Sequence, residues 1–315
     1  MAEPGFVTSQ FSDFLVPAGL AVVMFGLGLG LTGADFRRVP RAPRAVALGL
    51  AAQVVALPLL AVGVALLFHR GLGLGPVLVQ GLLLVACCPS GAVTNFFTYL
   101  ARGDLALSVT LNGVVSVASA VTTPIAFVAT SVLVLGSAPE VAVSFTGVAG
   151  VVLALIVAPM LLGMLLRNRR PGLALRAEKP FRLGAMAFLA FIVAGVIYAN
   201  RENFAQLILL SGAAVLALNI LAFGSGFLLA RLARLGEPET RAISMEVGFQ
   251  NGGLGIALAL GQMQSPPMAV VPGVYSLLMF FVGGIAAWLW ARRPLPAGGP
   301  GDLRAAESTT TSSKK

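Results

Sequence analysis

The stretch MEVGFQNGGLGIALAL, residues 245–260, places a carboxylate, two amides and a glycine pair inside an otherwise apolar run. Glycine weakens a helix because it has the most backbone freedom to lose, so Gly252 and Gly253 predict an interruption. Glu246 is costlier, because an acid inside a membrane span costs roughly 2.5–3.5 kcal/mol and needs a partner, a water-filled site or a proton. The stretch therefore predicts a broken helix that carries a site.

The composition of the chain is that of a protein embedded in a membrane. Its 315 residues are 57% hydrophobic and 10% charged, whereas soluble domains carry about 25% charged residues. The basic residues, which give a net charge of +9, lie in short loops between apolar runs. This pattern is typical of membrane topology and does not indicate nucleic-acid binding. We therefore expect an all-α polytopic membrane protein with no nucleic-acid partner.

Apolar runs bounded by Pro, Gly and charged residues predict nine transmembrane helices. With nine spans, 19 of the 21 basic residues fall on one side of the membrane, and only Arg70 and Arg201 fall on the other. The positive-inside rule then predicts a multi-pass cell-membrane protein with its N-terminus outside and its C-terminus in the cytoplasm. The predicted helices lie near 14–32, 43–68, 75–101, 104–134, 140–166, 181–200, 203–231, 240–263 and 267–291.

The segments between and after these helices carry most of the charge. The loop after the first helix holds Arg37, Arg38 and Arg41, and the residues from Arg167 to Arg182 are expected in the loop before the sixth helix. We assign residues 1–291 to one transmembrane transporter domain. Residues 292–315 are rich in Pro, Gly, Ser and Thr, and this composition predicts a disordered cytoplasmic tail.

A second break is predicted in CCPSGAVTNFF, residues 87–97. Pro89 removes a backbone donor and clashes with the preceding turn, and Gly91 adds flexibility. A simple proline kink is the alternative interpretation. The third predicted helix runs inward and the eighth runs outward, however, and paired broken helices of opposite direction indicate an inverted-repeat transporter with a site near the midplane.

Polar side chains from four predicted helices lie at one depth, about a third of the way into the membrane at ~1.5 Å per residue. They offer carboxylate, amide and hydroxyl oxygens, which are ligands for group I or II cations, and one carboxylate among neutral oxygens favours a monovalent ion. Broken helices add free carbonyls and N-terminal dipoles that attract an anion. The pattern indicates a cation-coupled transporter of an organic anion. These residues are Gln53, Thr94, Asn95, Ser108, Asn112, Glu246 and Gln250.

Five stretches together resemble the bile acid:sodium symporter family, including its bacterial homologues. The resemblance implies inverted repeats with two crossing discontinuous helices, divided into a core domain and a panel domain. We expect the core around residues 43–134 and 203–263, and the panel in the remaining helices. The resembling stretches, which extend from about residue 24 to 275, are MFGLGLGLTGADF, AAQVVALP, CCPSGAVTNFFTYLARGDLALSV, EVGFQNGGLGIALAL and PGVYS.

The resemblance also implies two sodium ions as coupling ions, and no other cofactor. Asn112 departs from the family pattern, which has a hydroxyl residue there, but it still offers an oxygen. Ala92 stands where several bacterial relatives have Thr, so the resemblance does not name the substrate. The implied residues are Thr94, Asn95, Ser108, Asn112 and Glu246 for the first ion; Gln53, Glu246, Val247, Phe249 and Gln250 for the second; and Pro89, Gly91, Ala92, Asn251 and Gly252 for the substrate.

We therefore expect a sodium-coupled secondary active symporter that imports an organic anion by alternating access. The anion is bile-acid-like or a small 2-oxo or hydroxy acid such as pantoate or pyruvate. Proton coupling through Glu246 and a membrane receptor without transport remain alternatives, as does a purely structural Glu246. An enzyme is not expected, because no Ser/His or paired-Asp arrangement is present, and no obligate protein partner is indicated. Cys87 and Cys88 are interpreted as packing residues, and His69 as an interfacial one.

Overall fold

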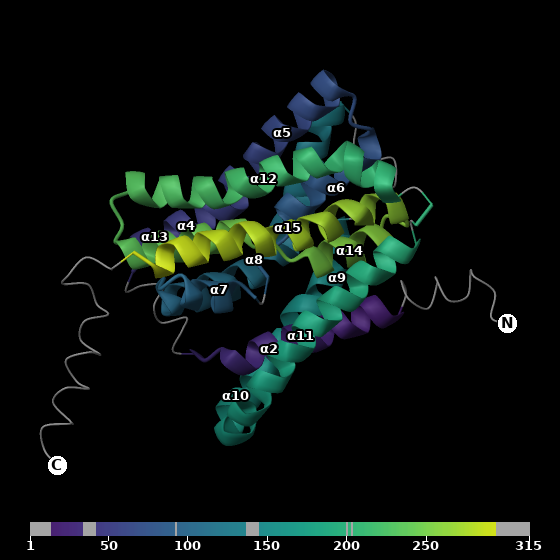
Figure 1. Ribbon diagram of the computed structural model, residues 1–315. Coiled ribbons are helices and arrows are strands. Elements are labelled where there is room, and N and C mark those ends of the chain that lie inside the picture. The colour runs from purple at the N-terminus through teal and green to yellow at the C-terminus, as the bar shows by residue number, and fades with distance from the viewer. Residues whose placement is uncertain are drawn as a thin grey trace, which may run out of the picture.

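The computed structural model describes residues 14–33, 42–91, 93–136, 145–199, 201–202 and 204–293. Within these ranges the chain is helical (Figure 1). Its only β-type pairing there is one isolated bridge between Ser90 and Gln250. The all-α prediction is therefore confirmed. Predictions for Ala92, for Arg37, Arg38 and Arg41, and for the tail from residue 294 onward lie outside the described residues.

Each of the nine predicted ranges contains helical structure, in two cases with an interruption. The elements are α2 (Val16–Gly30), α4 (Pro43–Ala51), η2 (Ala52–Ala56), α5 (Leu57–Leu72), α6 (Pro76–Cys87), α7 (Thr94–Leu100), α8 (Leu105–Leu135), α9 (Phe145–Val152), η3 (Leu153–Val157), α10 (Ala158–Arg169), α11 (Pro171–Ala199), α12 (Phe204–Leu232), α13 (Glu237–Gly248), α14 (Gly252–Gly261) and α15 (Pro266–Ala291).

Five helical stretches in the described part of the chain are long and apolar enough to cross a membrane, and α2, α6 and α14 are shorter apolar helices. Their outer faces carry large exposed hydrophobic side chains, including Leu67, Leu133 and Phe281, each more than 60% exposed. Contact between so large an apolar surface and water is unfavourable, whereas contact with lipid tails is not. The chain is therefore a multi-pass membrane protein. The five stretches are Pro43–Leu72, Leu105–Leu135, Thr146–Arg169, Ser211–Leu232 and Pro266–Ala291.

The start of the sixth predicted helix was wrong. The sequence predicts that the sixth helix starts near residue 181 and that Arg176, Lys179 and Arg182 belong to the loop before it. α11 begins at Pro171, so all three lie within the helix. Proline is well suited to the first position of a helix, where its missing N–H is not needed. Charged residues limit the part of a helix that lies in lipid, but they do not end the helix itself. A boundary inferred from charge therefore marks the edge of the membrane and not the first residue of α11.

Two helices are interrupted, where the sequence predicted the breaks. α6 ends at Cys87, and Cys88 is extended with ψ 156°, as expected for a residue that precedes proline. α13 ends at Gly248, and Phe249 is extended with ψ 112° before α14 begins at Gly252. Each half is too short to cross a ~30 Å hydrocarbon core alone. In Figure 1, α7 and α13 lie toward one end of the molecule, and α14 lies toward the other.

The two breaks cross and bind each other through their backbones. The Gly91 amide donates to the Phe249 carbonyl at 3.3 Å, and the Asn251 amide donates to the Pro89 carbonyl at 2.8 Å. Ser90 and Gln250 face each other across this antiparallel bridge. Backbone groups away from water must find partners inside the protein. Each break therefore supplies partners that the other requires.

Two π-helical turns precede prolines in otherwise regular helices. η2 lies just before Pro58 and η3 just before Pro159, and in each case an amide bonds five residues back, as Leu57 does to Ala52. A proline ring clashes with the carbonyl four residues earlier and cannot donate to it, so the preceding turn widens. Gln53, a predicted ligand, lies on the first of these turns.

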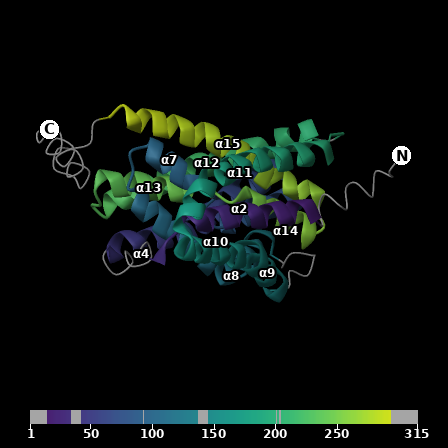
Figure 2. The same cartoon turned by 90° about the horizontal axis from the view of Figure 1, so that it is seen from below.

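A separate layer of the molecule is formed by α2, α10 and α11, which contact one another (Figure 1). In Figure 2, seen from below, α2 and α10 lie side by side near the middle of the view, in front of the other helices. α2 and α10 meet backbone to backbone, because a Cβ at Gly28 would collide with the Met160 carbonyl oxygen and one at Gly163 with the Phe25 carbonyl oxygen. Small residues allow such close contact between membrane helices.

We predict that Gly28→Ala separates α2 from α10 and lowers the unfolding temperature of the purified protein in detergent. The expected cost is about 1–3 kcal/mol, the usual penalty for an overpacked contact. Gly63→Ala on α5 is the control, because its Cβ would meet open space. That control should be neutral or slightly stabilising, because Ala favours a helix over Gly by up to ~1 kcal/mol. Equal unfolding temperatures for the two variants would contradict the packing argument.

Candidate functional site

The side chain of Ser108 on α8 is surrounded by oxygens from two other helices. Its Oγ lies 2.5 Å from Oε1 of Glu246 on α13, 2.9 Å from Oδ1 of Asn95 on α7 and 3.1 Å from Oγ1 of Thr98, also on α7. Ser108 and Thr98 are fully buried, and Glu246 is 2% exposed. The structure thus brings together three of the residues predicted for the first sodium ion.

This cluster has more oxygen lone pairs than protons to share among them. A serine hydroxyl donates one hydrogen, so Ser108 can satisfy either Glu246 or Asn95, and the Thr98 hydroxyl can supply at most one more. A carboxylate in its ionised form only accepts. A surplus of buried oxygens without donors is costly unless a cation or an added proton lies among them.

Two further oxygens near the crossover lack a hydrogen-bond partner among the described residues, namely Oε2 of Glu246 and Oδ1 of Asn112. The Asn112 amide nitrogen donates to the Gly91 carbonyl at 3.0 Å, so its oxygen is oriented away from that bond. The Ser90 hydroxyl approaches the Glu246 carboxyl group without completing a hydrogen bond of good geometry. Unpaired buried acceptors in such numbers fit a site that receives a cation.

Thr94 caps the break instead of facing Ser108. Its Oγ1 donates to the Gly91 carbonyl at 2.8 Å, and its amide donates to the same carbonyl at 3.1 Å. The Gly91 carbonyl thus accepts from Thr94 and from Asn112. Among the predicted residues of the first site, Thr94 is therefore positioned beside the oxygen cluster and not within hydrogen-bond distance of Glu246 in this conformation.

The residues predicted for the second ion form another buried group. Gln53 donates to Oε1 of Gln250 at 2.9 Å, and Gln250 donates to the Val247 carbonyl at 2.8 Å. The Phe249 carbonyl accepts from Gly91 within the crossover. The side-chain amides of Gln53 and Gln250 therefore bond to each other, and both would have to rotate before their oxygens could face one ion.

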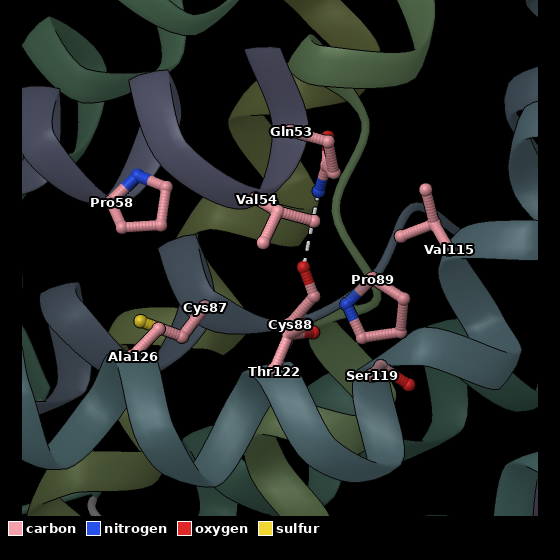
Figure 3. Close-up of a pocket in the computed structure, with 10 residues that line it drawn as sticks. All are labelled: Gln53, Val54, Pro58, Cys87, Cys88, Pro89, Val115, Ser119, Thr122 and Ala126. Atoms are coloured by element: carbon pink, nitrogen blue, oxygen red, sulfur yellow. Dashed lines mark hydrogen bonds between the residues drawn. The ribbon is translucent and has the colours of Figure 1, made fainter. Parts of the chain in front are cut away.

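A small pocket, partly open to the outside, lies next to Gln53. The Gln53 amide points across it and donates to the Cys88 carbonyl at 3.1 Å (Figure 3). On the α6 side the Thr123 hydroxyl donates to the Cys87 carbonyl at 2.8 Å, so polar groups of α8 satisfy the open end of α6. The lining residues are Gln53, Val54, Pro58, Cys87, Cys88, Pro89, Val115, Ser119, Thr122 and Ala126.

The residues predicted to bind substrate lie at the crossover, with the exception of Ala92, which is not among the described residues. Pro89 and Gly91 take part in the backbone bridge. The oxygen of Asn251 caps α14 by accepting from Leu254 at 3.0 Å, and its nitrogen lies 3.8 Å from the sulfur of Met24 on α2. A thioether is a weak acceptor, so the amide donors of Asn251 are poorly satisfied where the crossover meets α2.

Sequence reasoning missed three residues of this region. Thr98 contacts the oxygen cluster, and Met24 contacts Asn251. Ser116 lies one turn beyond Asn112 on α8, and its buried hydroxyl has no hydrogen-bond partner among the residues that the structure describes. The spacing 108, 112, 116 along one helix face was readable in the sequence. Nothing in the sequence distinguishes Met24 from the other apolar residues of α2, because its role depends on a neighbour far along the chain.

Comparison with known proteins leads to one family. A family model described as the sodium bile acid symporter family matches residues 17–207. The chain is 34% identical over 274 residues to the uncharacterized sodium-dependent transporter YocS of Bacillus subtilis, an alignment that covers 87% of this chain and 82% of that protein.

Similarity extends to two plant proteins. The chain is 31% identical over 306 residues to the rice protein named "Probable sodium/metabolite cotransporter BASS2, chloroplastic", covering 96% of this chain and 70% of the rice protein. It is 32% identical over 281 residues to "Probable sodium/metabolite cotransporter BASS1, chloroplastic" of Arabidopsis thaliana, covering 87% of this chain and 66% of that protein.

The helical membrane architecture and these similarities define the class as a sodium-coupled membrane transporter, and not an enzyme. The chain belongs to the sodium bile acid symporter family.

We predict that Ser108→Ala weakens sodium binding, because it removes an oxygen that lies between Glu246 and Asn95. Removing a group that hydrogen-bonds to metal ligands typically costs 10–100-fold in metal affinity. The measurement is the rise in unfolding temperature during a NaCl titration, with choline chloride keeping the ionic strength constant. Ser225→Ala on α12 is the matched control, because its hydroxyl bonds only within its own helix, to Ala222. If the curve of unfolding temperature against sodium concentration is not shifted in Ser108→Ala, Ser108 is not part of the site.

Proposed function

We propose that this protein is a symporter that imports an organic anion together with sodium ions moving down their gradient, by alternating access. The observation that carries the proposal is the oxygen cluster around Ser108, Glu246 and Asn95, which lies beside the crossing of two broken helices. A cation at the cluster would be held by groups from three separate helices. It would therefore stabilise one arrangement of those helices over others, as coupling requires.

The first sodium ion is assigned to Asn95, Ser108, Asn112 and Glu246, with Thr94 at its edge. Oε2 of Glu246 and Oδ1 of Asn112 support this assignment, because both are buried acceptors without a hydrogen-bond donor among the described residues, and a cation could bind them. One carboxylate among neutral oxygens balances a single positive charge. Proton coupling through Glu246 is the second candidate, because a proton on the carboxyl group would also relieve the surplus of acceptors.

A second ion is assigned to Gln53, Val247, Phe249 and Gln250, with the Glu246 carboxylate shared between the two ions. The pairing of Gln53 with Gln250 supports the grouping, because these side chains meet although they are 197 positions apart. Rotation of both amides would exchange their mutual bonds for bonds to an ion. Each sodium ion moving inward through 100 mV releases about 2.3 kcal/mol, so two ions could concentrate a monovalent anion against its own charge.

The proposed topology has nine transmembrane helices, counting each interrupted pair as one, with the N-terminus outside and the C-terminus in the cytoplasm. The two interrupted helices would be equivalent parts of an inverted repeat.

The panel is assigned to α2, α9, η3, α10 and α11. The close contact of α2 with α10 at Gly28 and Gly163 supports movement of the panel as one body. The sequence assigned residues 267–291 to the panel, but the packing of α15 against α6, α12 and α14 favours counting it with the core.

The substrate is proposed to bind between α2 and the crossover. Asn251 supports this location. Among the described residues its amide nitrogen has the sulfur of Met24 as its acceptor, and a carboxylate would be a far better one. The N-terminus of α14 starts at the same point and attracts negative charge. A bile-acid-like compound or a small 2-oxo or hydroxy acid, such as pantoate or pyruvate, meets these requirements. A thermal-shift screen of organic anions in sodium and in choline would identify which one binds.

We predict that Glu246→Ala abolishes sodium-driven uptake of the anion in proteoliposomes. Wild type should accumulate the anion when external sodium exceeds internal sodium, and it should stop when choline replaces sodium at constant pH. Uptake that continues in choline and follows a proton gradient would establish proton coupling instead. A protein that binds the anion but moves none under any gradient would be a receptor. Ser225→Ala should transport like wild type, because its hydroxyl lies outside both proposed ion sites.

We predict that Gln250→Ala leaves one sodium ion bound and removes the other. Uptake should lose the sigmoidal dependence on sodium that two ions produce, and its Hill coefficient should fall toward about 1, because a single coupling ion gives a hyperbolic response. The measurement is initial uptake rate against sodium concentration at saturating anion. An unchanged Hill coefficient above one would remove Gln250 from the second site.

A further inference from the structure

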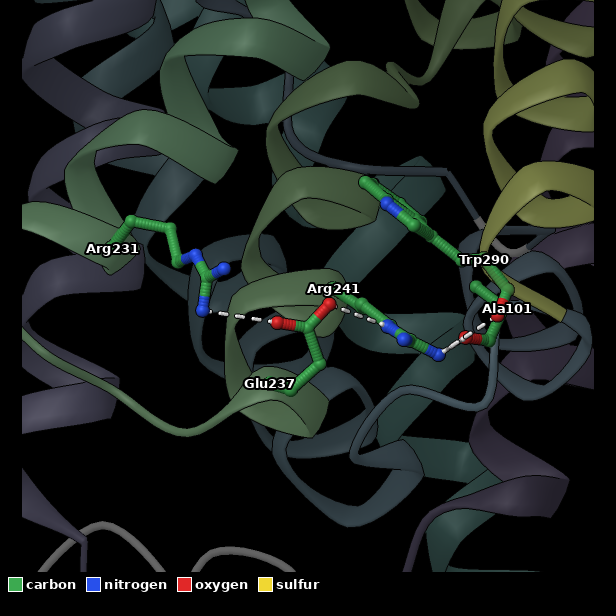
Figure 4. A network of polar contacts seen from close by, with 5 residues as sticks. All are labelled: Ala101, Arg231, Glu237, Arg241 and Trp290. Atoms are coloured by element: carbon green, nitrogen blue, oxygen red, sulfur yellow. Dashed lines mark hydrogen bonds and ion pairs between the residues drawn. The ribbon is translucent and has the colours of Figure 1, made fainter. Parts of the chain in front are cut away.

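Arg241 is the largest fully buried side chain in the described part of the chain, with 1% of its surface exposed. It lies on α13, five residues before Glu246. Its Nε donates to Oε1 of Glu237 at 3.1 Å, and its Nη1 donates to the carbonyls of Ala101 at 3.0 Å and Trp290 at 3.1 Å (Figure 4). A buried charge is retained only when it is paired and hydrogen-bonded, so this set of contacts needs a physical account.

The two carbonyls come from the ends of two other helices. Ala101 follows the last residue of α7, and Trp290 is next to the last residue of α15. The final carbonyls of a helix lack partners within it, and they form the negative end of its dipole. The Arg241 guanidinium therefore binds α13 to the C-terminal ends of α7 and α15. Glu237 balances the charge, and it pairs in turn with Arg231 of α12 at 3.1 Å.

α7 depends on outside contacts to hold its position. It has seven residues, fewer than the ~12–15 that an isolated helix needs even to be marginal in water. Its N-terminal side is held by the crossover, where Gly91 bonds to Phe249. Its C-terminal side is held by Arg241 and by the turn that follows, in which the Asp104 amide donates to the Pro238 carbonyl at 2.8 Å.

These contacts bear directly on the oxygen cluster. Asn95 and Thr98 lie on α7, and Glu246 lies on α13, so the distance from the amide oxygen to the carboxylate depends on how the two helices are joined. Arg241 joins them one to two turns away from those oxygens, at ~1.5 Å of helix rise per residue. The other connection, at the crossover, lies on the opposite side of the cluster.

We propose that Arg241 is a positioning residue for sodium, holding α7 against α13 so that the oxygens of Asn95 and Glu246 stay within reach of one ion. The inference rests on the proposed sodium site. Arg241 itself touches no ion. It acts through the backbone of α7, and its planar fork of donors lets one side chain bind an acid and two carbonyls at once. A lysine has a single nitrogen at its end and cannot reproduce that geometry.

The test is a NaCl titration of unfolding temperature in wild type, Arg241→Gln and Arg241→Lys, with choline chloride keeping the ionic strength constant. Stabilisation by an ion at concentration c grows as RT ln(1 + c/Kd), so the sodium concentration that stabilises the fold by RT ln 2 equals the dissociation constant. This concentration is called the sodium midpoint. We expect the midpoint to rise roughly ten- to a hundredfold in Arg241→Gln and by a smaller factor in Arg241→Lys, the range seen when partners of metal ligands are removed.

Arg292→Gln is the matched control. It removes a positive charge at the same end of α15, where Arg292 is exposed and stacks on Trp288 at 3.7 Å. Its sodium midpoint should equal that of wild type. A merely structural role for Arg241 would lower the unfolding temperature in choline while leaving the sodium midpoint unchanged. That result would overturn the inference.

Two further outcomes separate this inference from the function on which it rests. If wild type gains no stability from sodium beyond that from choline, the sodium site itself is wrong. If neither Arg241 variant folds, Glu237→Ala decides, because it removes the acid that orients Arg241 and leaves the arginine in place. A raised sodium midpoint in Glu237→Ala supports the positioning role, and an unchanged midpoint rejects it.

Discussion

The backbone bonds between the two helix breaks are the interaction on which the rest of the structure depends. A break inside a membrane protein leaves amides and carbonyls without partners, and each costs several kcal/mol if it stays unpaired away from water. Here the amides of Gly91 and Asn251 bond to the carbonyls of Phe249 and Pro89, so neither break is stable without the other. This mutual dependence brings α7 and α13 together, and with them the side chains of the oxygen cluster.

The cluster is a second constraint, opposite in kind. Most buried polar groups in a protein form hydrogen bonds with one another, as the backbone groups of the crossover do. Around Ser108 the oxygens outnumber the available protons, and Oε2 of Glu246 and Oδ1 of Asn112 have no hydrogen-bond partner in the described part of the chain. Such an arrangement is unfavourable by itself and favourable with a cation. A transporter requires this difference, because an ion can shift a conformational equilibrium only by as much as it prefers one state.

The packing around these sites is uneven. α2 and α10 touch backbone to backbone at Gly28 and Gly163, whereas α2 meets the crossover through the flexible side chain of Met24. Close backbone contacts resist relative movement, because neither side can yield, while a methionine contact can be broken and remade. The molecule therefore combines a rigid contact between α2 and α10 with an adaptable contact between α2 and the crossover, where the substrate is proposed to bind.

Local residues determined much of this protein, and the sequence showed it. Apolar runs set the helices, and Pro89 and Gly252 marked both breaks, because proline and glycine act on the backbone where they occur. The depth count also found Asn95, Ser108 and Glu246, since helix rise converts spacing into position. Charge misplaced the start of α11, because charged residues leave the membrane without ending a helix.

Only the tertiary structure decided which groups meet. Gln53 and Gln250 are 197 positions apart, Arg241 reaches the carbonyls of Ala101 and Trp290, and Met24 lies against Asn251. Thr98 joined the oxygen cluster although it looks like any other threonine in an apolar run. These pairings depend on how helices distant in the chain pack together, and hydrophobic periodicity describes the face of each helix but not its neighbour.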